Sequence, residues 1–254
     1  MLTEESGLTA VRLNSRKSSS SMPRKTGVYK PSRRFRELAG KVDPVKTYSI
    51  ADAVNILKSG TKKCKFDETV DLAIKLDIDT KQADQLVRGS FSLPKGTGKT
   101  MRVICFADGA MAEAARKAGA IEAGGEDLAK KVEGGWLDFD VAVAHPATMR
   151  YVGRLGKVLG PKGLMPSPKS GTVTTDVAKA VTEFKAGKIE FRNDSFGNIH
   201  VAVGKLSFAN ADLEANVRAM IDHVLSLRPQ TVKGNYFRKA TLTSTMGPGL
   251  RLAV

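Results

Sequence analysis

The chain has 254 residues, with 41 Lys and Arg against 26 Asp and Glu and a net charge of +15. This length suffices for one or two domains with their own hydrophobic cores, so the fold needs neither disulfides nor a structural metal. Cys64 and Cys105 are the two cysteines, and neither lies in a Cys-x-x-Cys pattern. Their positions disfavour a disulfide scaffold and a zinc site, and favour a reducing, cytoplasmic compartment.

The sequence holds no run of 18 apolar residues, so we expect no membrane-spanning helix and no membrane partner. The excess of basic residues instead favours a polyanionic partner, most often nucleic acid. The three histidines, His145, His200 and His223, lie in unrelated segments without the spacing of metal ligands. We therefore expect neither a metal site nor a cofactor.

Residues 1–21 are polar, lack the apolar stretch of a signal peptide and contain Glu4 and Glu5, which are unlike a transit peptide. We expect Met22 to be the true start, with residues 1–21 either disordered or the product of a misassigned start codon. Residues 22–41 contain seven basic residues and one acid and form a cationic arm, which either contacts nucleic acid or is simply solvated. We interpret residues 1–30 as a disordered basic N-terminal extension.

The first periodic segments predict a helix and two strands. Ser49 and Asp52 have the spacing of a capping box, which predicts a helix over residues 50–60. Apolar and polar residues then alternate over residues 69–76, as in a strand with one buried face. A second short strand is expected at residues 89–93.

Strand-like and helix-like runs alternate from residue 101 to about residue 187. Apolar runs at residues 103–107 and 139–144 suit strands buried on both faces. Residues 110–118, 126–132 and 176–185 have helical patterns, and Gly119 is placed to end the first of these helices. This alternation predicts a Rossmann-like, three-layer α/β unit with a mostly parallel sheet.

Strands return after residue 187. Apolar residues at 189–191 and 199–203 flank a glycine-containing turn at residues 194–198, which predicts a β-hairpin. A long helix over residues 211–227 follows, with Asn210 or Asp212 as its cap, and residues 236–245 form the last expected strand.

Two glycine-bearing joints, one at Gly96 and Gly98 and the other at Gly187, bracket the middle segment. We expect an α/β protein of two domains, in which an α+β domain of residues 31–96 and 188–254 receives an inserted domain of residues 97–187. Gly96, Gly98 and Gly187 would form the hinge, because glycine changes its backbone angles without a Cβ clash. The alternative is one continuous domain whose glycines merely form turns.

Patterns typical of enzymes are weak. The sequence around Gly98, Lys99 and Thr100 fails as a P-loop, because Leu93 stands where the first glycine is required. No Gly-x-Ser-x-Gly elbow occurs, and neither cysteine has an adjacent catalytic signature. We expect no catalytic residue, and a nucleotide-dependent enzyme built on the central unit remains the alternative hypothesis.

A basic, glycine- and proline-rich segment spans residues 153–169. We expect a looped backbone that presents amides and cations to phosphates, through Arg154, Lys157, Lys162 and Lys169. An exposed basic loop without a ligand is the alternative.

Together with residues 66–70, 88–89, 188–194 and 243–248, this segment closely resembles the large-subunit ribosomal proteins of the L-one family. The resemblance covers residues from about Pro31 to the C-terminus. It implies two domains joined by a hinge, binding to large-subunit rRNA and a mobile stalk that assists release of tRNA from the exit site. It also implies repression of the protein's own messenger RNA and a ribosomal, cytoplasmic location; outside the ribosome we expect a monomer.

The resemblance places the rRNA site on two stretches of the first domain. Thr69 and Thr245 would offer hydroxyls, Glu68 would accept a hydrogen bond from the RNA, and Gly247 would admit the sugar edge. Phe66 would stack, although without the resemblance it could equally be a core aromatic. The remaining expected site residues are phosphate-binding Lys65, Arg192 and Lys239, together with Thr243 and Met246.

Overall fold

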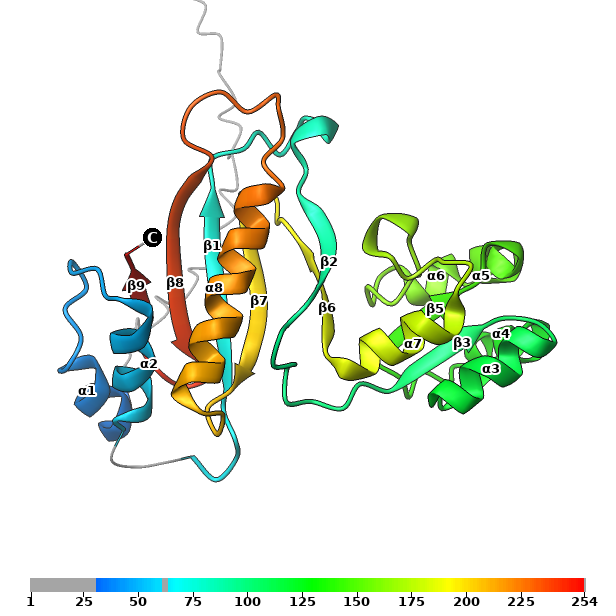
Figure 1. Cartoon of the computed structure of the whole chain (residues 1–254), viewed down its shortest axis with the longest axis horizontal. Helices are drawn as coiled ribbons and strands as arrows, with labels where there is room; N and C mark the ends of the chain where they lie inside the picture. Colours follow the sequence, from blue (N-terminus) through cyan, green and yellow to red (C-terminus); the bar gives the residue numbers. More distant parts are fainter. Residues whose placement is uncertain (1–30, 61–63, 254) are drawn as a thin grey trace, which may run out of the picture. The chain divides into compact units, whose positions relative to one another are not determined.

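The computed structural model describes residues 31–60 and 64–253. The extension predicted at residues 1–30 and the start expected at Met22 lie outside these residues. The described chain mixes helices with three β-sheets (Figure 1), which confirms the α/β fold class. None of its described helices combines the length and apolar character needed to cross a bilayer.

The largest sheet is antiparallel and has four strands. Its order is β7 (Asn198–Lys205), β1 (Thr69–Leu76), β8 (Phe237–Ser244) and β9 (Leu250–Leu252). Alternate residues of β1 are buried, as the period of two predicts. In this register Leu72 lies opposite Val201 on β7 and opposite Leu242 on β8, so all three strands contribute to one apolar face.

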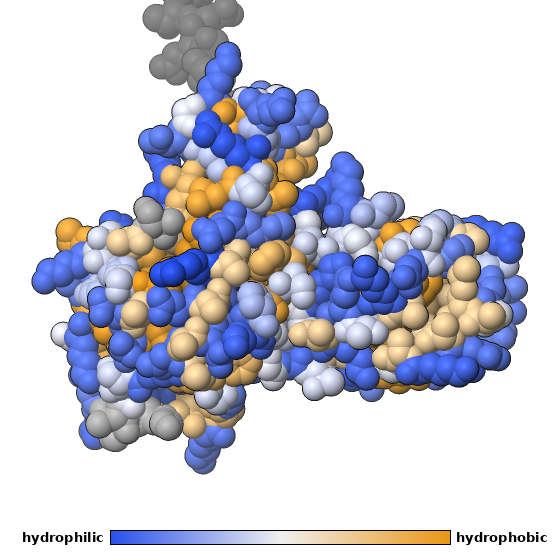
Figure 2. All heavy atoms as spheres, in the orientation of Figure 1, coloured by the Kyte–Doolittle hydropathy of each residue, from blue (hydrophilic) through white to orange (hydrophobic). Residues whose placement is uncertain are grey.

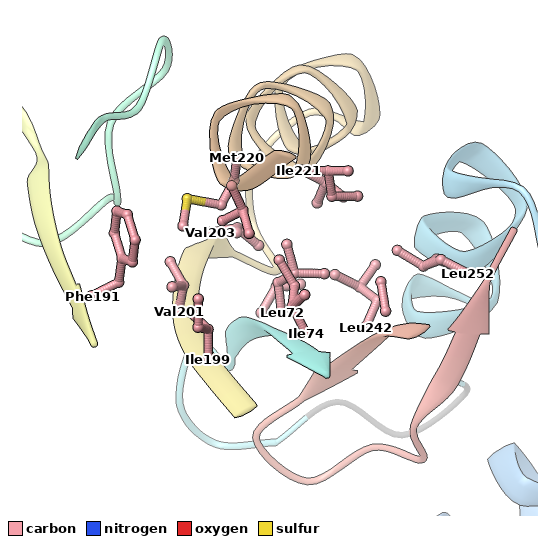
Figure 3. Close-up of a cluster of buried hydrophobic side chains, with 14 of the residues drawn as sticks. Leu72, Ile74, Phe191, Ile199, Val201, Val203, Met220, Ile221, Leu242 and Leu252 are labelled. Carbon is pink, nitrogen blue, oxygen red and sulfur yellow. The ribbon is translucent and has the colours of Figure 1, made fainter. Parts of the chain in front are cut away.

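Two helices cover that apolar face. They are α2 (Ile50–Lys58) and α8 (Asn210–Ser226), and Figure 3 shows Met220 and Ile221 of α8 directed toward Leu72 and Leu242 of the sheet. The hydroxyl of Ser49 accepts a hydrogen bond from the amide of Asp52, as the capping pattern predicts. The cap expected for α8 is wrong: its N-cap is Ala209, which has no capping side chain.

The hairpin predicted after residue 187 forms only at its turn, where an antiparallel bridge joins Asn193 and Ile199. β6 (Lys188–Arg192) pairs with β2 (Arg88–Ser92) in a separate two-stranded sheet, while β7 pairs with β1. Asn193 explains the difference, because its backbone amide and its side-chain oxygen both bond to the backbone of Val87, continuing the pairing with the β2 side. The chain then changes sheet at a turn in which Asp194 accepts two backbone amides.

The third sheet is parallel, in the order β4 (Glu122–Gly124), β3 (Val103–Phe106) and β5 (Val141–Ala144). Val103 and Cys105 of β3 join a cluster with α3 (Ala110–Ala118) and α7 (Val177–Ala186). Ile104 and Phe106 join a second cluster with α4 (Glu126–Glu133) and the helices after β5. Burial on both faces confirms the predicted three-layer arrangement; β4, only three residues long, was not predicted.

Short helices complete the described chain. The basic segment 153–169 is not simply looped, because it begins within α5 (Met149–Arg154) and continues through α6 (Gly156–Leu159). An unexpected helix, α1 (Arg33–Ala39), lies within the segment interpreted as a cationic arm. The remaining turns of helix are η1 (Ala83–Gln85), η2 (Pro146–Thr148) and η3 (Pro168–Ser170).

The two glycine joints lie side by side. Gly96, Gly98 and Gly187 all have left-handed backbone angles, with φ of +67°, +72° and +108°. A Cβ added to Gly187 would lie 2.7 Å from the Cα of Gly96, so the two chain segments touch at a point that admits no side chain. The largest buried cluster takes residues only from outside this pair of joints, which agrees with the predicted inserted domain; that division stays a proposal.

Two polar side chains fix the chain on either side of the first joint. The amide of Asn216, fully buried in α8, accepts from the backbone of Lys95 and donates to the carbonyls of Gly96 and Val203. Beyond the joint, Asp140 accepts from Lys99 and Arg102; although burial opposes ionisation, these bonds lower the pKa of Asp140 to about 2. Asn216 therefore holds the chain as far as Gly96 and Asp140 holds it again from Lys99, so only Thr97 and Gly98 lie between the two anchors.

We predict that Asn216→Ala destabilises the protein. The substitution leaves buried backbone groups at the joint without partners, and each costs about 1–3 kcal/mol. Arg218→Ala, an exposed change on the same helix, is the control and should alter the free energy of unfolding by less than about 0.5 kcal/mol. Urea denaturation of both variants is the measurement; equal stabilities would contradict the anchoring role of Asn216.

Candidate nucleic-acid interface

The two stretches that the sequence singled out meet at one end of the four-stranded sheet. β1 and β8 run antiparallel, so residues just before β1 lie beside residues just after β8. The amide of Thr245 donates to the carbonyl of Thr69 over 3.0 Å, and the amide of Thr69 donates to the hydroxyl of Thr245 over 3.0 Å. Residues separated by 176 positions in the chain are thus directly bonded.

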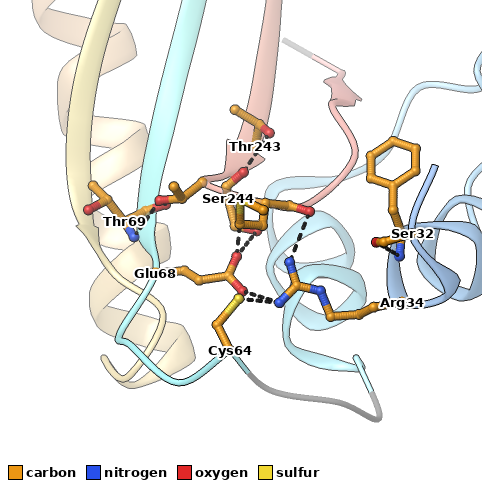
Figure 4. A network of polar contacts seen from close by, with 10 residues as sticks. Ser32, Arg34, Cys64, Glu68, Thr69, Thr243 and Ser244 are labelled. Carbon is orange, nitrogen blue, oxygen red and sulfur yellow. Dashed lines mark hydrogen bonds and ion pairs between the residues drawn. The ribbon is translucent and has the colours of Figure 1, made fainter. Parts of the chain in front are cut away.

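Glu68 is the centre of this end of the sheet (Figure 4). It is only 7% exposed, and its Oε2 accepts from the hydroxyl of Ser244 at 2.8 Å and from the amide of Met246 at 3.2 Å. Its Oε1 lies 3.3 Å from the guanidinium of Arg34. Three chain segments therefore converge on one carboxylate.

The environment of Glu68 keeps it ionised. Burial alone would raise the pKa of this carboxyl, but hydrogen bonds from Cys64, Ser244 and Met246 and the charge of Arg34 outweigh burial and lower it. Both oxygens of Glu68 are engaged inside the protein, where they hold the turn after β8; a hydrogen bond from RNA to Glu68 stays a prediction.

Other expected site residues also have internal partners. The hydroxyl of Thr69 accepts from Lys205 at 2.8 Å, and that of Thr243 donates to the carbonyl of Ser244 at 3.1 Å. A Cβ on Gly247 would lie 2.4 Å from the hydroxyl of Ser244, which Glu68 holds in place. These residues give the surface its shape, and the turn needs glycine at position 247.

The side chains that project from this end are apolar and basic. Phe66 is 53% exposed and Met246 is 50% exposed, in a chain whose large hydrophobic residues are mostly buried. Phe66 is therefore not a core aromatic. Lys65 and Thr245, their neighbours in the chain, are exposed as well. We define this group, Lys65, Phe66, Thr245 and Met246, as the strand-end patch.

The structure does not bring Arg192 and Lys239 to the strand-end patch. Arg192 lies on β6 in the two-stranded sheet, opposite Arg88. Lys239 lies opposite Lys75 and is six residues from Thr245 along β8, which corresponds to roughly 20 Å of strand. Both are exposed, so they are available as separate cationic points.

The basic residues of the middle segment are exposed as well. Arg154 ends α5, Lys157 is in α6, Lys162 follows α6 and Lys169 is in η3. Hydrophilic residues occur across the face drawn in Figure 2, with hydrophobic ones among them, so hydropathy alone does not locate an interface. Sequence reasoning missed Arg34 and Lys205 as partners of the site; both lay among many cations without a distinguishing pattern.

Nothing in the described part of the chain forms a metal centre: no group of three or more His, Cys, Asp or Glu side chains is placed to hold an ion. The ordered polar contacts of the candidate site are instead internal to the protein, and they display exposed apolar and cationic side chains. This arrangement is suited to contact with a macromolecular surface.

The family model and the similar proteins found by comparison indicate the same family. Residues 57–248 match the model of the Ribosomal protein L1p/L10e family. The large ribosomal subunit protein uL1 of Cutibacterium acnes is 55% identical over 223 residues, which cover 88% of this chain and 96% of that protein. The proteins of the same name from Protochlamydia amoebophila and Clavibacter michiganensis are each 52% identical, over 88% of this chain and 94% and 97% of their own lengths.

We predict that Glu68 makes the stability of the protein depend on pH. The pKa of Glu68 is lower in the folded than in the unfolded chain. Its contribution to the free energy of unfolding is therefore fully present above the unfolded-state pKa of about 4.3, and it is lost as the pH falls through the lower pKa of the folded state. At pH 7 Glu68→Gln should lower the free energy of unfolding by about 1–3 kcal/mol, and the difference from wild type should shrink below pH 4. Urea denaturation across this range is the measurement; a difference independent of pH would contradict it.

Proposed function

The chain belongs to the Ribosomal protein L1p/L10e family and is a structural protein of the large ribosomal subunit, and on this premise we propose that it binds large-subunit rRNA through the strand-end patch. Its relatives are named as ribosomal proteins rather than enzymes, and its place is the cytoplasmic ribosome. No observation in the described chain favours the alternative of a nucleotide-dependent enzyme.

One observation carries the proposal: the buried Glu68 network joins the segment before β1, from which Phe66 projects, to the turn after β8, from which Met246 projects. Proteins recognise folded RNA by shape, by stacking on splayed bases and by contacts to 2′-hydroxyls. Phe66 is suited to stacking and Met246 to packing against a sugar or base. Lys65 lies close enough in the chain to reach adjoining phosphates, and the more distant Arg192 and Lys239 would contact the backbone elsewhere.

The remaining functions that the resemblance implies are proposed for separate parts of the chain. Residues 97–187 would form an inserted domain that moves about Gly96, Gly98 and Gly187 as a stalk. Four exposed cations on it would meet tRNA at the exit site, namely Arg154, Lys157, Lys162 and Lys169. The adjacency of the two joints supports a hinge, since two neighbouring segments restrict the motion to opening and closing.

A translational role follows from the same chemistry. A messenger RNA whose fold presents the features recognised in rRNA would occupy the strand-end patch in its place. We therefore propose that the free protein, a monomer outside the ribosome, represses its own messenger RNA. Competition between the two RNAs for the patch would link repression to ribosome assembly.

We predict that binding depends on the strand-end patch rather than on diffuse positive charge. Phe66→Ala should weaken binding to a large-subunit rRNA fragment by about 10- to 100-fold, because base stacking on an aromatic is worth about 1–3 kcal/mol. Met246→Asp should also weaken it, by placing a carboxylate against RNA. Lys117→Ala, an exposed change on α3, is the control and should cost less than about threefold. Fluorescence anisotropy with labelled RNA is the measurement; equal losses in all three variants would overturn the placement.

A further inference from the structure

We propose that Arg34 is a positioning residue for RNA binding: its guanidinium fixes Glu68, and through Glu68 it fixes the turn that carries Met246. This inference deepens the proposed function and rests on it. Arg34 lies in α1, outside residues 57–248 that match the family model, and within the segment interpreted from its charge as a cationic arm. The structure gives this one cation a different role from its neighbours.

The local fold directs Arg34 inward. Ser32 caps α1 by accepting from the amide of Phe35 at 3.2 Å, and Leu38 of the same helix is buried, with its side chain beside Gly60. With the helix held at both ends, the side chain of Arg34 is only 17% exposed. Figure 4 shows it extending from α1 toward the end of the sheet.

The guanidinium joins three segments that are distant in the sequence. Its Nη1 lies 3.3 Å from Oε1 of Glu68 and also donates to the sulfur of Cys64. Its Nη2 donates to the carbonyl of Met246 over 3.5 Å. Because Glu68 accepts from the amide of the same Met246, the residue that projects from the turn is held by its amide and by its carbonyl.

The chemistry of this contact requires arginine. A planar fork with several donors can bind a carboxylate and a carbonyl at once, whereas the ammonium of lysine is a compact point charge. The carboxylate of Glu68 is buried, and a buried charge that loses its partner is strongly destabilising where it stands. Without Arg34, the turn at Met246 would move to let water reach Glu68, and the strand-end patch would lose its shape.

The two other arginines of α1 differ from Arg34. Arg33 and Arg36 are exposed, so they are free to face solvent or phosphate. Arg33 therefore provides a matched control: Arg33→Met and Arg34→Met each remove one positive charge from the same helix, and only the second breaks the contact with Glu68. A difference between the two variants cannot come from net charge.

The experiment is the affinity of the full-length protein for a large-subunit rRNA fragment at several salt concentrations. A lost phosphate contact reduces the slope of log K against log salt by about 1, whereas a lost positioning contact leaves the slope unchanged. We expect Arg34→Met to bind at least tenfold more weakly at every salt concentration with the slope of wild type. We expect Arg33→Met to stay within about threefold of wild type.

Further variants keep the test decisive. Arg34→Lys, which preserves the charge, should show a partial loss with an unchanged slope, and it serves if Arg34→Met does not fold. The double variant Arg34→Met/Glu68→Gln should bind no more weakly than the weaker single variant, because the two residues act as a unit. In the free protein, the methyl NMR signal of Met246 should shift in Arg34→Met but not in Arg33→Met.

The experiment distinguishes failure of the proposed function from failure of the positioning role of Arg34. Wild-type protein without affinity for the fragment would overturn the proposed function itself. Wild-type binding with equal affinities for Arg33→Met and Arg34→Met, or a slope reduced by about 1 in Arg34→Met alone, would overturn the positioning role of Arg34 and leave the proposed function standing.

Discussion

The carboxylate of Glu68 accepts hydrogen bonds from the hydroxyl of Ser244 and the amide of Met246 and pairs with the guanidinium of Arg34. Through these contacts one buried charge connects α1, the start of β1 and the turn after β8. The exposed positions of Phe66 and Met246 follow from that connection, because each lies within two residues of Glu68 or of the groups bonded to it. The strand-end patch is thus the outer surface of an internal polar network.

In this arrangement, the residues that shape the strand-end patch are distinct from most of the cations that make the protein basic. A net charge of +15 would attract RNA without fixing where it binds. The position of the turn that carries Met246 is instead set by groups that have hydrogen-bond or ion-pair partners inside the protein, namely a carboxylate, an arginine and several hydroxyls. The glycine joints show a similar arrangement, because polar side chains anchor the chain on both sides of the first joint, Asn216 on one side and Asp140 on the other.

The sequence predicted elements whose signals are local. The alternation in β1, the cap at Ser49 and the terminal Gly119 of α3 each depend on neighbouring residues, and each was correct. The turn between β6 and β7 was correct, but the pairing of the two strands beyond it was wrong, since Asn193 bonds to Val87, a partner 106 positions away. Glu68 was placed in the site from its sequence motif, but its burial and its bond to Arg34 depend on tertiary packing. The residues of the patch were therefore predictable, whereas the contacts that organise them were not.

The affinity of Glu68→Gln for a large-subunit rRNA fragment tests the central claim most directly, because charge and position predict opposite signs. The substitution removes a negative charge near the RNA, so a surface that binds through its electrostatic field would bind more tightly. If Glu68 instead holds the turn that carries Met246, the neutral side chain that replaces its carboxylate binds Arg34 and the backbone amide of Met246 poorly. The affinity for RNA then falls. We expect a loss of at least tenfold at constant salt; an unchanged or higher affinity would contradict the positioning role of the buried network.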